Sequence, residues 1–214
     1  MDIPLEKRLK KRLHVEVGRL QDEVMEAAYA LDGSLVFHGG TAIWRCFSGN
    51  RFSEDLDLYS SHPGKIADGL SEILSSRALT LSKFKKTDNL IFAKITNGEM
   101  EVRLEINTAV KKRGIATRYE KMNGSHMDVL CLTLEGLVME KAAAYKNRRF
   151  VRDLYDIYHL SGMLEGGSEA KTAVASLLFG FKPPRDEANL PALVYSGAVP
   201  TVQQMLLALR RRFG

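Results

Sequence analysis

Two aspartates separated by one residue, Asp55 and Asp57, are the side chains in this sequence best suited to catalysis. Side chains alternate along a β-strand, so both carboxylates would project from one face while Leu56 and Leu58 pack on the other. Paired carboxylates provide the hard oxygen ligands that hold Mg²⁺ together with the phosphates of a substrate. Asp-x-Asp also occurs on solvated strand edges, so the pair alone does not identify a metal site.

A glycine-threonine stretch, Gly39-Gly40-Thr41, ends fourteen residues before Asp55. We expect a short buried strand over Leu35–His38, a tight turn at the two glycines and a helix capped by Thr41. The N–H groups at such a helix start, and the positive end of the helix dipole, favour an anion such as a triphosphate. The two stretches together therefore predict metal-dependent phosphoryl transfer.

This spacing is typical of a known group of enzymes. Gly-Gly-Thr, thirteen intervening residues and Asp-x-Asp resemble the nucleotidyltransferase superfamily of the DNA polymerase β type. Within it, the strings G-G-T-A-I-x-R and R-F-S-E-D-L-D-L resemble the AbiEii/MenT-type toxin nucleotidyltransferases. The resemblance implies an α+β fold with a polymerase β-like nucleotidyltransferase core, in which helices flank a mixed sheet, and a helical C-terminal portion.

The elements around these motifs follow from periodicity. Residues 3–31 carry apolar side chains every three or four positions, which predicts one long amphipathic helix with a kink near Gly18. Pro63 marks the start of another helix. The predicted strands after it cover residues 79–84, 90–95 and 100–107, the last two joined by a hairpin turn at Asn97-Gly98.

A third carboxylate is expected on the strand over residues 100–107. Its apolar side chains alternate with polar ones, so Glu101 and Glu105 share the polar face. The resemblance places the last acid on a strand beside the Asp55/Asp57 pair. We therefore assign it to Glu105, with Glu101 as the alternative, in the role of metal ligand or general base for the incoming hydroxyl.

Residues 108–126 are polar and basic, which predicts a loop, and a short strand over 128–132 is expected next. Thr133 then caps a helix that has Lys141 on its apolar stripe. An ammonium group there must either snorkel to solvent or meet an anion, because a buried unpaired charge is costly. Both interpretations remain open on periodicity alone.

The stretch from Glu140 to Tyr158 resembles the second signature of the AbiEii-type enzymes, a lysine on one helix and R-D-x-x-D at the start of the next. By this resemblance Lys141 contacts the triphosphate, while Arg152 and Asp153 position nucleotide or lysine. Asp153 and Asp156 also share one face of the first helical turns, where acids stabilise a helix without any catalytic role. The later chain predicts helices over 168–179 and 201–213, a break at Pro183-Pro184 and a loop around Pro191.

The chain has 214 residues and a net charge of +5, with its lysines and arginines in clumps. Clumped basic residues favour a polyanion such as nucleic acid, although each clump alone is typical of a solvated helix face. The two cysteines, Cys46 and Cys131, match neither a disulfide framework nor a pair of zinc ligands. The charged N-terminus lacks a signal core and no apolar window is long enough to span a bilayer. We therefore expect a cytoplasmic protein without membrane contact.

The resemblance gives the expected organisation and activity. Residues 1–132 would form the nucleotidyltransferase core with its N-terminal helix, and residues 133–214 the helical region with the second signature. The enzyme would bind an NTP with Mg²⁺ or Mn²⁺ and transfer NMP to an RNA, expected to be the 3′ end of tRNA. The implied metal-binding and catalytic residues are Asp55, Asp57 and Glu105, and the implied nucleotide-binding residues are Gly39, Gly40, Thr41, Arg51, Ser53, Lys141, Arg152 and Asp153.

Members of this family are toxins of toxin-antitoxin or phage-defence systems, which implies a cognate antitoxin as partner. Two alternatives remain open on sequence grounds. One is a nucleic-acid-binding or regulatory protein that keeps the acids without turnover. The other is a nucleotidyltransferase that acts on a small alcohol, such as a sugar or an antibiotic.

Overall fold

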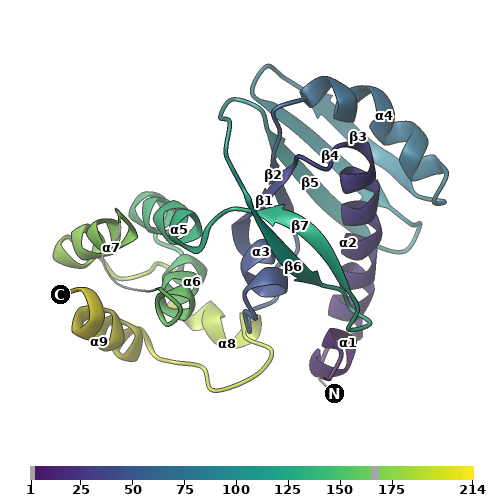
Figure 1. Ribbon diagram of the computed structural model, residues 1–214. Coiled ribbons are helices and arrows are strands. Elements are labelled where there is room, and N and C mark those ends of the chain that lie inside the picture. Colours follow the sequence, from purple (N-terminus) through teal and green to yellow (C-terminus); the bar gives the residue numbers. More distant parts are fainter. Residues whose placement is uncertain (1–2, 165–168) are drawn as a thin grey trace. The chain divides into compact units, whose positions relative to one another are not determined.

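The structure, a computed structural model, describes residues 3–164 and 169–214 (Figure 1). The chain forms two compact units. The first runs to Ser48 and resumes from Phe52 to Leu132, while the second combines Gly49–Arg51 with Thr133–Gly214.

The first unit contains the sheet. Its elements, in chain order, are α1 (Leu5–Arg8), α2 (Arg12–Leu31), β1 (Val36–His38), α3 (Gly39–Cys46), β2 (Leu56–Tyr59), α4 (Pro63–Ser75), β3 (Thr80–Lys86), β4 (Leu90–Thr96), β5 (Glu101–Asn107), β6 (Ile115–Glu120) and β7 (His126–Cys131). The seven strands lie in the order β3-β4-β5-β2-β1-β7-β6, with β2/β5 and β1/β7 parallel and the other pairs antiparallel. This mixed sheet confirms the predicted α+β class.

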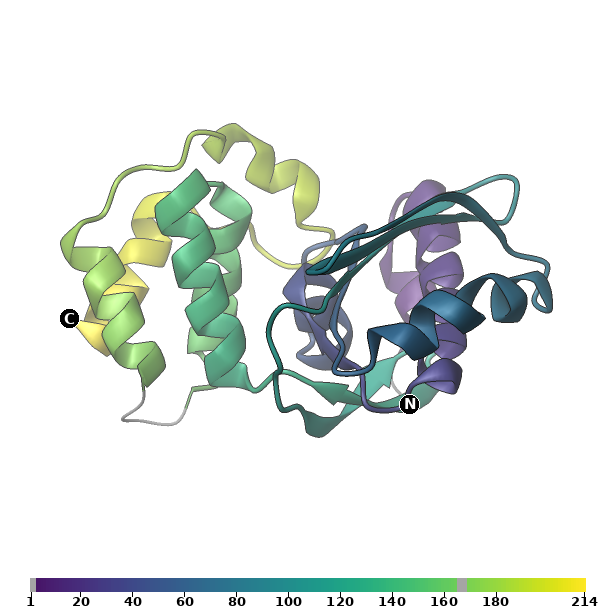
Figure 2. The same cartoon turned by 90° about the horizontal axis from the view of Figure 1, so that it is seen from above.

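Three helices cover the apolar side of the sheet. α2 and α4 lie side by side in both views (Figures 1 and 2), and they contact β5 and β3 respectively. α3 packs on β1, β2 and β6. The alternating apolar residues of the central strands are fully buried, as the pattern predicts: Leu56, Leu58, Val102, Leu104 and Ile106. The polar residues between them project to the opposite face.

The single N-terminal helix predicted over residues 3–31 is wrong. The backbone is extended at Leu9 and Lys11, which separates α1 from α2 and lets Leu5 and Leu9 both be buried. Gly18 lies inside α2 and causes no break. A Cβ at Gly18 would lie 2.5 Å from Met122 Sδ, so glycine here permits close packing against the segment after β6.

The predicted loop over 108–126 is also wrong, because it contains β6. β6 is one of the two edge strands of the sheet, and Tyr119 is its one buried residue. An edge strand with a single buried side chain has too little apolar alternation to be distinguished from a polar loop.

The second unit is helical. Its elements are α5 (Leu134–Arg148), α6 (Val151–Ser161), α7 (Glu169–Phe179), the 3₁₀ turn η1 (Glu187–Asn189), α8 (Leu190–Leu193) and α9 (Val202–Phe213). Thr133 caps α5 through a bond from Gly136 N–H, as predicted. The loop expected around Pro191 is instead α8, because proline is well tolerated in a first helical turn. Ser168, the predicted start of α7, lies outside the described residues.

None of the helices in residues 3–164 and 169–214 has both the length and the apolar character needed to cross a bilayer.

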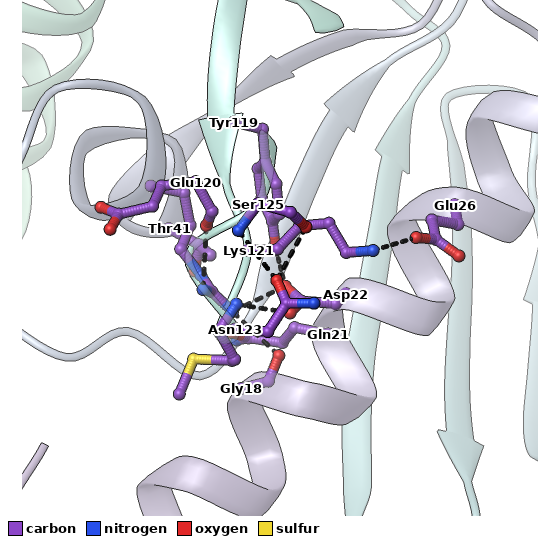
Figure 3. Close-up of polar contacts among 12 residues, drawn as sticks. Gly18, Gln21, Asp22, Glu26, Thr41, Tyr119, Glu120, Lys121, Asn123 and Ser125 are labelled. Atoms are coloured by element: carbon purple, nitrogen blue, oxygen red, sulfur yellow. Dashed lines mark hydrogen bonds and ion pairs between the residues drawn. The ribbon is translucent and has the colours of Figure 1, made fainter. Parts of the chain in front are cut away.

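A buried ion pair fixes α3 to its neighbours. The Arg45 side chain is fully buried, and its Nη2 donates to Asp22 Oδ1 at 3.0 Å and to Gly18 O at 2.8 Å. Asp22 also accepts hydrogen bonds from the Tyr119 hydroxyl and from Met122 N–H (Figure 3). Burial raises the pKa of Asp22, and the charge of Arg45 is the main influence that opposes this rise.

Arg45 also contacts aromatic rings. Its guanidinium carbon lies 4.2 Å from the ring centre of Trp44 and 5.1 Å from that of Tyr119. The arginine of the G-G-T-A-I-x-R string therefore links α3, α2 and β6 within the first unit. Its role in this structure is to hold the helix that follows the glycines.

We predict that Arg45→Met lowers the free energy of unfolding by about 3–5 kcal/mol, because Asp22 would stay buried without its counter-ion. Urea denaturation measures the loss. Arg19→Met is the matched control, since Arg19 is half exposed in its ion pair with Glu6 and should contribute at most about 1 kcal/mol. Equal effects of the two substitutions would contradict the role given to Arg45.

Candidate active site

The register between β2 and β5 brings two acids together. These strands are parallel, and Asp57 pairs with Glu105 while Leu56 pairs with Leu104. Paired residues of adjacent strands project to the same side, so Asp57 and Glu105 lie next to each other on the face opposite the helices. Asp55 immediately precedes β2 and does not belong to the strand. All three acids are half-buried.

Glu101 lies elsewhere on β5. It pairs with Thr96 at the start of the strand, and its carboxylate binds Lys94 Nζ at 2.6 Å and the Ser82 hydroxyl at 2.7 Å. The structure thus brings Glu105, and not Glu101, beside Asp57.

The acids crowd one another electrostatically. The pKa of Glu105 is raised above its ordinary value by burial, then by the charges of Asp57 and Asp55, while Arg103 and His38 oppose the rise. Like charges held this close favour a cation between them. The donor chemistry of three carboxylates fits a hard ion such as Mg²⁺.

Arg103 supplies a cation to Asp55 in this structure. Its Nε and Nη2 donate to the two oxygens of Asp55 at 2.7 and 2.8 Å, the two-point geometry typical of arginine and carboxylate. In the part of the chain that the structure describes, no three His, Cys, Asp or Glu side chains are arranged to hold a metal ion as they stand. In this structure the Arg103 bonds engage both oxygens of Asp55.

Gly39 sets the distance between α3 and the acids. Its φ is +78°, and a Cβ built on it would lie 2.1 Å from Asp57 Oδ2. Any other residue would displace the carboxylate. α3 therefore begins against Asp57, and its first N–H groups, which have no acceptors within the helix, are available to an anion near the acids.

The prediction that Thr41 caps this helix is wrong. α3 begins at Gly39, so His38 is the N-cap and Thr41 is the third residue of the helix. Thr41 is fully buried, and its hydroxyl donates to the carbonyl of Asp55 at 2.5 Å. The side chain thus fixes the Asp55 segment to α3, and what Thr41 can offer a phosphate is its backbone N–H.

Gln21 of α2 holds the same segment from the other side. It is fully buried, and its Nε2 donates to the carbonyls of Ser53 and Glu54 at 2.9 Å each. Together Thr41 and Gln21 fix the backbone of residues 53–55. The periodicity of residues 3–31 gave no indication that Gln21 would make these contacts.

His38 and Tyr59 also lie at this site. His38 pairs with Asp57 across β1 and β2, and its ring stacks on Tyr59 with centroids 4.0 Å apart. His38 was not among the residues predicted for the site. The available signal was its place at the end of a buried strand, directly before the glycines.

The charged residues of the predicted nucleotide-binding set lie in the second unit. Arg51 is buried and donates Nε and Nη2 to the two oxygens of Asp156 at 2.9 and 2.8 Å, and Lys141 Nζ lies 2.8 Å from the same carboxylate. Burial would raise the pKa of Asp156, but the charges of Arg51 and Lys141 outweigh it and hold the pKa at about 2. Lys141 is thus a buried lysine paired with an acid of the second signature.

Asp153 is completely buried and accepts two hydrogen bonds from Arg148, both at 2.7 Å. This arrangement favours the structural role for Asp153 over contact with a nucleotide. Arg152 is half-buried, with its guanidinium carbon 5.4 Å from the ring centre of Phe150. Nucleotide contacts by Arg51, Lys141, Arg152 and Asp153 stay predictions.

Comparison with protein families gives the identity of this arrangement. The family model described as nucleotidyl transferase AbiEii toxin, type IV TA system, matches residues 23–194. The chain belongs to this family. It is a nucleotidyltransferase, and the range matched includes the three acids, α3 and the second signature.

Solved structures share the fold at low sequence identity. MenT4, a nucleotidyltransferase toxin from Mycobacterium tuberculosis H37Rv, is 17% identical with a TM-score of 0.61, over 94% of this chain and 83% of its own. JHP933 from Helicobacter pylori is 18% identical with a TM-score of 0.62, over 93% and 89%. The antibiotic-resistance factor ANT(2″)-Ia is 16% identical with a TM-score of 0.51, over 77% and 92%. No match was found among curated proteins.

We predict that Arg103→Gln strengthens Mn²⁺ binding by about fivefold, because the ion would no longer compete with a half-exposed ion pair that contributes at most about 1 kcal/mol. Electron paramagnetic resonance of free Mn²⁺ measures the affinity. Arg118→Gln, at an exposed position of β6, removes the same charge and should leave the affinity unchanged. Weaker binding by the Arg103 variant would mean that Arg103 supports the metal site.

Glu105→Gln should raise the melting temperature of the metal-free protein at pH 7. The folded protein binds the Glu105 proton more tightly than the unfolded chain, so ionisation of this group costs stability as pH rises past the ordinary glutamate pKa. Glu101→Gln is the control, because hydrogen bonds from Lys94 and Ser82 lower the pKa of Glu101 and give the opposite sign.

Calorimetry with and without Mg²⁺ completes this comparison. Mg²⁺ should raise the melting temperature of the wild type and of Glu101→Gln but not of Glu105→Gln, because only a bound ion stabilises the folded state. A lower melting temperature of metal-free Glu105→Gln than of the wild type would contradict the crowding of the three acids.

Proposed function

We propose that this enzyme transfers NMP from an NTP to the 3′ end of an RNA, with tRNA as the expected acceptor and Mg²⁺ or Mn²⁺ as the metal. The observation that carries the proposal is the placement of Asp57 beside Glu105, with Asp55 adjacent and the start of α3 against Asp57. A nucleoside triphosphate needs both a group of acids that binds a divalent ion and donors for its phosphates, and this arrangement supplies both.

The first unit contributes three functions to this reaction. Asp55, Asp57 and Glu105 would hold the divalent ion, which when bound neutralises phosphate charge and makes the attacking hydroxyl more acidic. The N–H groups of Gly39, Gly40 and Thr41 face the bound phosphates. Gly39 keeps these donors close to the acids, so phosphates and metal ligands share one small volume.

In the chemical step, the RNA 3′-oxygen forms a bond to the α-phosphorus as the bond from that phosphorus to the bridging oxygen of the β-phosphate breaks, and pyrophosphate leaves. The hydroxyl proton must pass to a base. Glu105, which lies beside Asp57 in the register of β2 and β5, is the candidate base, acting directly or through the metal that it would help to hold.

The acceptor and the biological role rest on charge and family. A net charge of +5 with clumped lysines and arginines supports a polyanionic acceptor. The matched family is one of type IV toxins, so we propose that the enzyme acts as a toxin of a toxin-antitoxin or phage-defence system, in the cytoplasm, with a cognate antitoxin.

A small-molecule acceptor is the second candidate. The observation in its favour is the fold shared with ANT(2″)-Ia, which is an antibiotic-resistance factor. Transfer of NMP to a small alcohol in the absence of RNA would establish it. The basic clumps favour RNA instead.

The proposal is tested with purified protein, each labelled NTP, Mg²⁺ and total tRNA. We expect label on tRNA, and Asp57→Asn should lower the rate at least about 100-fold, since it removes one charge from the metal-binding group. Glu101→Gln changes a carboxylate on the same strand face and should keep wild-type activity. Full activity of Asp57→Asn, with its fold verified by circular dichroism, would overturn the assignment of the acids.

A further inference from the structure

The second unit contains a cationic pocket that the proposed chemistry does not use. It has a volume of about 250 Å³ and lies between α5, α7 and the segment after α7. α5 and α7 lie side by side (Figures 1 and 2). The residues that line it and carry the argument are Tyr145, Lys146, Arg149, Ser176, Phe181 and Lys182, and no acid is among the lining residues.

Aromatic rings form one wall. Tyr145 and Phe181 stack with centroids 5.8 Å apart and ring planes 11° from parallel. The Tyr145 hydroxyl donates to the carbonyl of Lys182 at 2.7 Å, which fixes the segment carrying both Phe181 and Lys182. Phe181 is half-buried, and Phe179 two residues earlier is 98% exposed. Exposed aromatic surface beside lysine and arginine is what single-stranded nucleic acid requires, because bases stack and phosphates need cations.

Two of the cations are available to a ligand. Lys146 Nζ donates to the Ser176 hydroxyl at 2.9 Å, whereas Arg149 and Lys182 have no carboxylate within ion-pair distance among the described residues. The nearby acids, Asp186 and Glu187, raise the pKa of the Tyr145 hydroxyl, after burial as the main cause. One oxygen of Asp186 is occupied by the N–H of Val151.

Arg149 occupies an unfavourable backbone conformation. It is the C-cap of α5 with φ +54°, a position where glycine is the usual residue. Its N–H donates to Tyr145 O at 2.8 Å, and its carbonyl accepts from Arg185 N–H at 2.9 Å. The backbone that carries the Arg149 guanidinium is therefore held in place by these two hydrogen bonds. Its positive φ is strained for arginine, and glycine at this position would relieve the strain.

We propose that this pocket binds one nucleotide of the RNA acceptor, with Phe181 against the base and Arg149 and Lys182 against the phosphate. The assignment rests on the proposed function, since it presumes an RNA acceptor. The volume excludes a helix of a protein partner, whose diameter is about 10–12 Å, but suits a base or a phosphate group. A free nucleotide also has a base and a phosphate, so the experiment below is designed to distinguish it from RNA.

The test uses full-length Arg149→Gly and Lys182→Ala, with Arg118→Ala and Lys171→Ala as controls that remove the same charges at exposed positions outside the pocket. Affinity for fluorescent tRNA is measured without NTP over a series of salt concentrations. We expect each pocket variant to bind about five- to tenfold more weakly, with a salt slope lowered by about one, and the controls to bind like the wild type. Arg149→Gly should keep or raise the melting temperature, so its loss of binding cannot be attributed to unfolding.

Three other outcomes would overturn the assignment of the pocket to the RNA acceptor. Wild-type binding by both pocket variants overturns the pocket while leaving the proposed function intact. A raised KM for NTP with unchanged tRNA affinity assigns the pocket to a free nucleotide and overturns the RNA assignment. Absence of tRNA binding by the wild type overturns both this inference and the RNA acceptor of the proposed function.

Discussion

The contact between Gly39 and Asp57 is the constraint on which the active site depends. With no side chain at Gly39, α3 can begin directly against a carboxylate of β2, and the parallel register of β2 with β5 places Glu105 on the other side of that carboxylate. Phosphate donors and metal ligands thus come from three adjacent pieces of the fold: the start of α3, the strand β2 and its neighbour in the sheet, β5. The positions of these three pieces relative to one another are set by the backbone, through the close approach at Gly39 and the register of β2 with β5.

The charged residues of the family motifs divide into two kinds. Arg45 and Arg51 are buried and bind Asp22 and Asp156, so these arginines stabilise α3 and the second unit respectively. Asp55, Asp57 and Glu105 are half-buried and repel one another, an arrangement that is unfavourable without a cation. Burial therefore separates the residues that maintain the fold from those available for chemistry, although both kinds occur within the same short strings and Asp55 is paired with Arg103.

Alternation and motif spacing were sufficient to predict the central features. The strand over 100–107, with Val102, Leu104 and Ile106 inward, follows from a period of two, and the resemblance led to the family. Features that depend on distant partners were not predictable. The break after α1 depends on the burial of Leu5 and Leu9, β6 carries only Tyr119 inward, and the Thr41 hydroxyl finds its acceptor fourteen residues later. Arg103 lies between Glu101 and Glu105 on β5, but its pairing with Asp55 depends on where Asp55 lies before β2, which the sequence does not give.

The central claim is that Asp55, Asp57 and Glu105 bind a divalent ion together with the phosphates of an NTP. The most direct measurement is a crystal structure with Mn²⁺ and a non-hydrolysable NTP analogue, in which anomalous scattering locates the metal. The account predicts an anomalous peak bound by these three carboxylates, the triphosphate against the N–H groups of Gly39 and Gly40, and Arg103 released from Asp55. A metal bound elsewhere, with the Arg103–Asp55 pair intact and the phosphates away from α3, would contradict it.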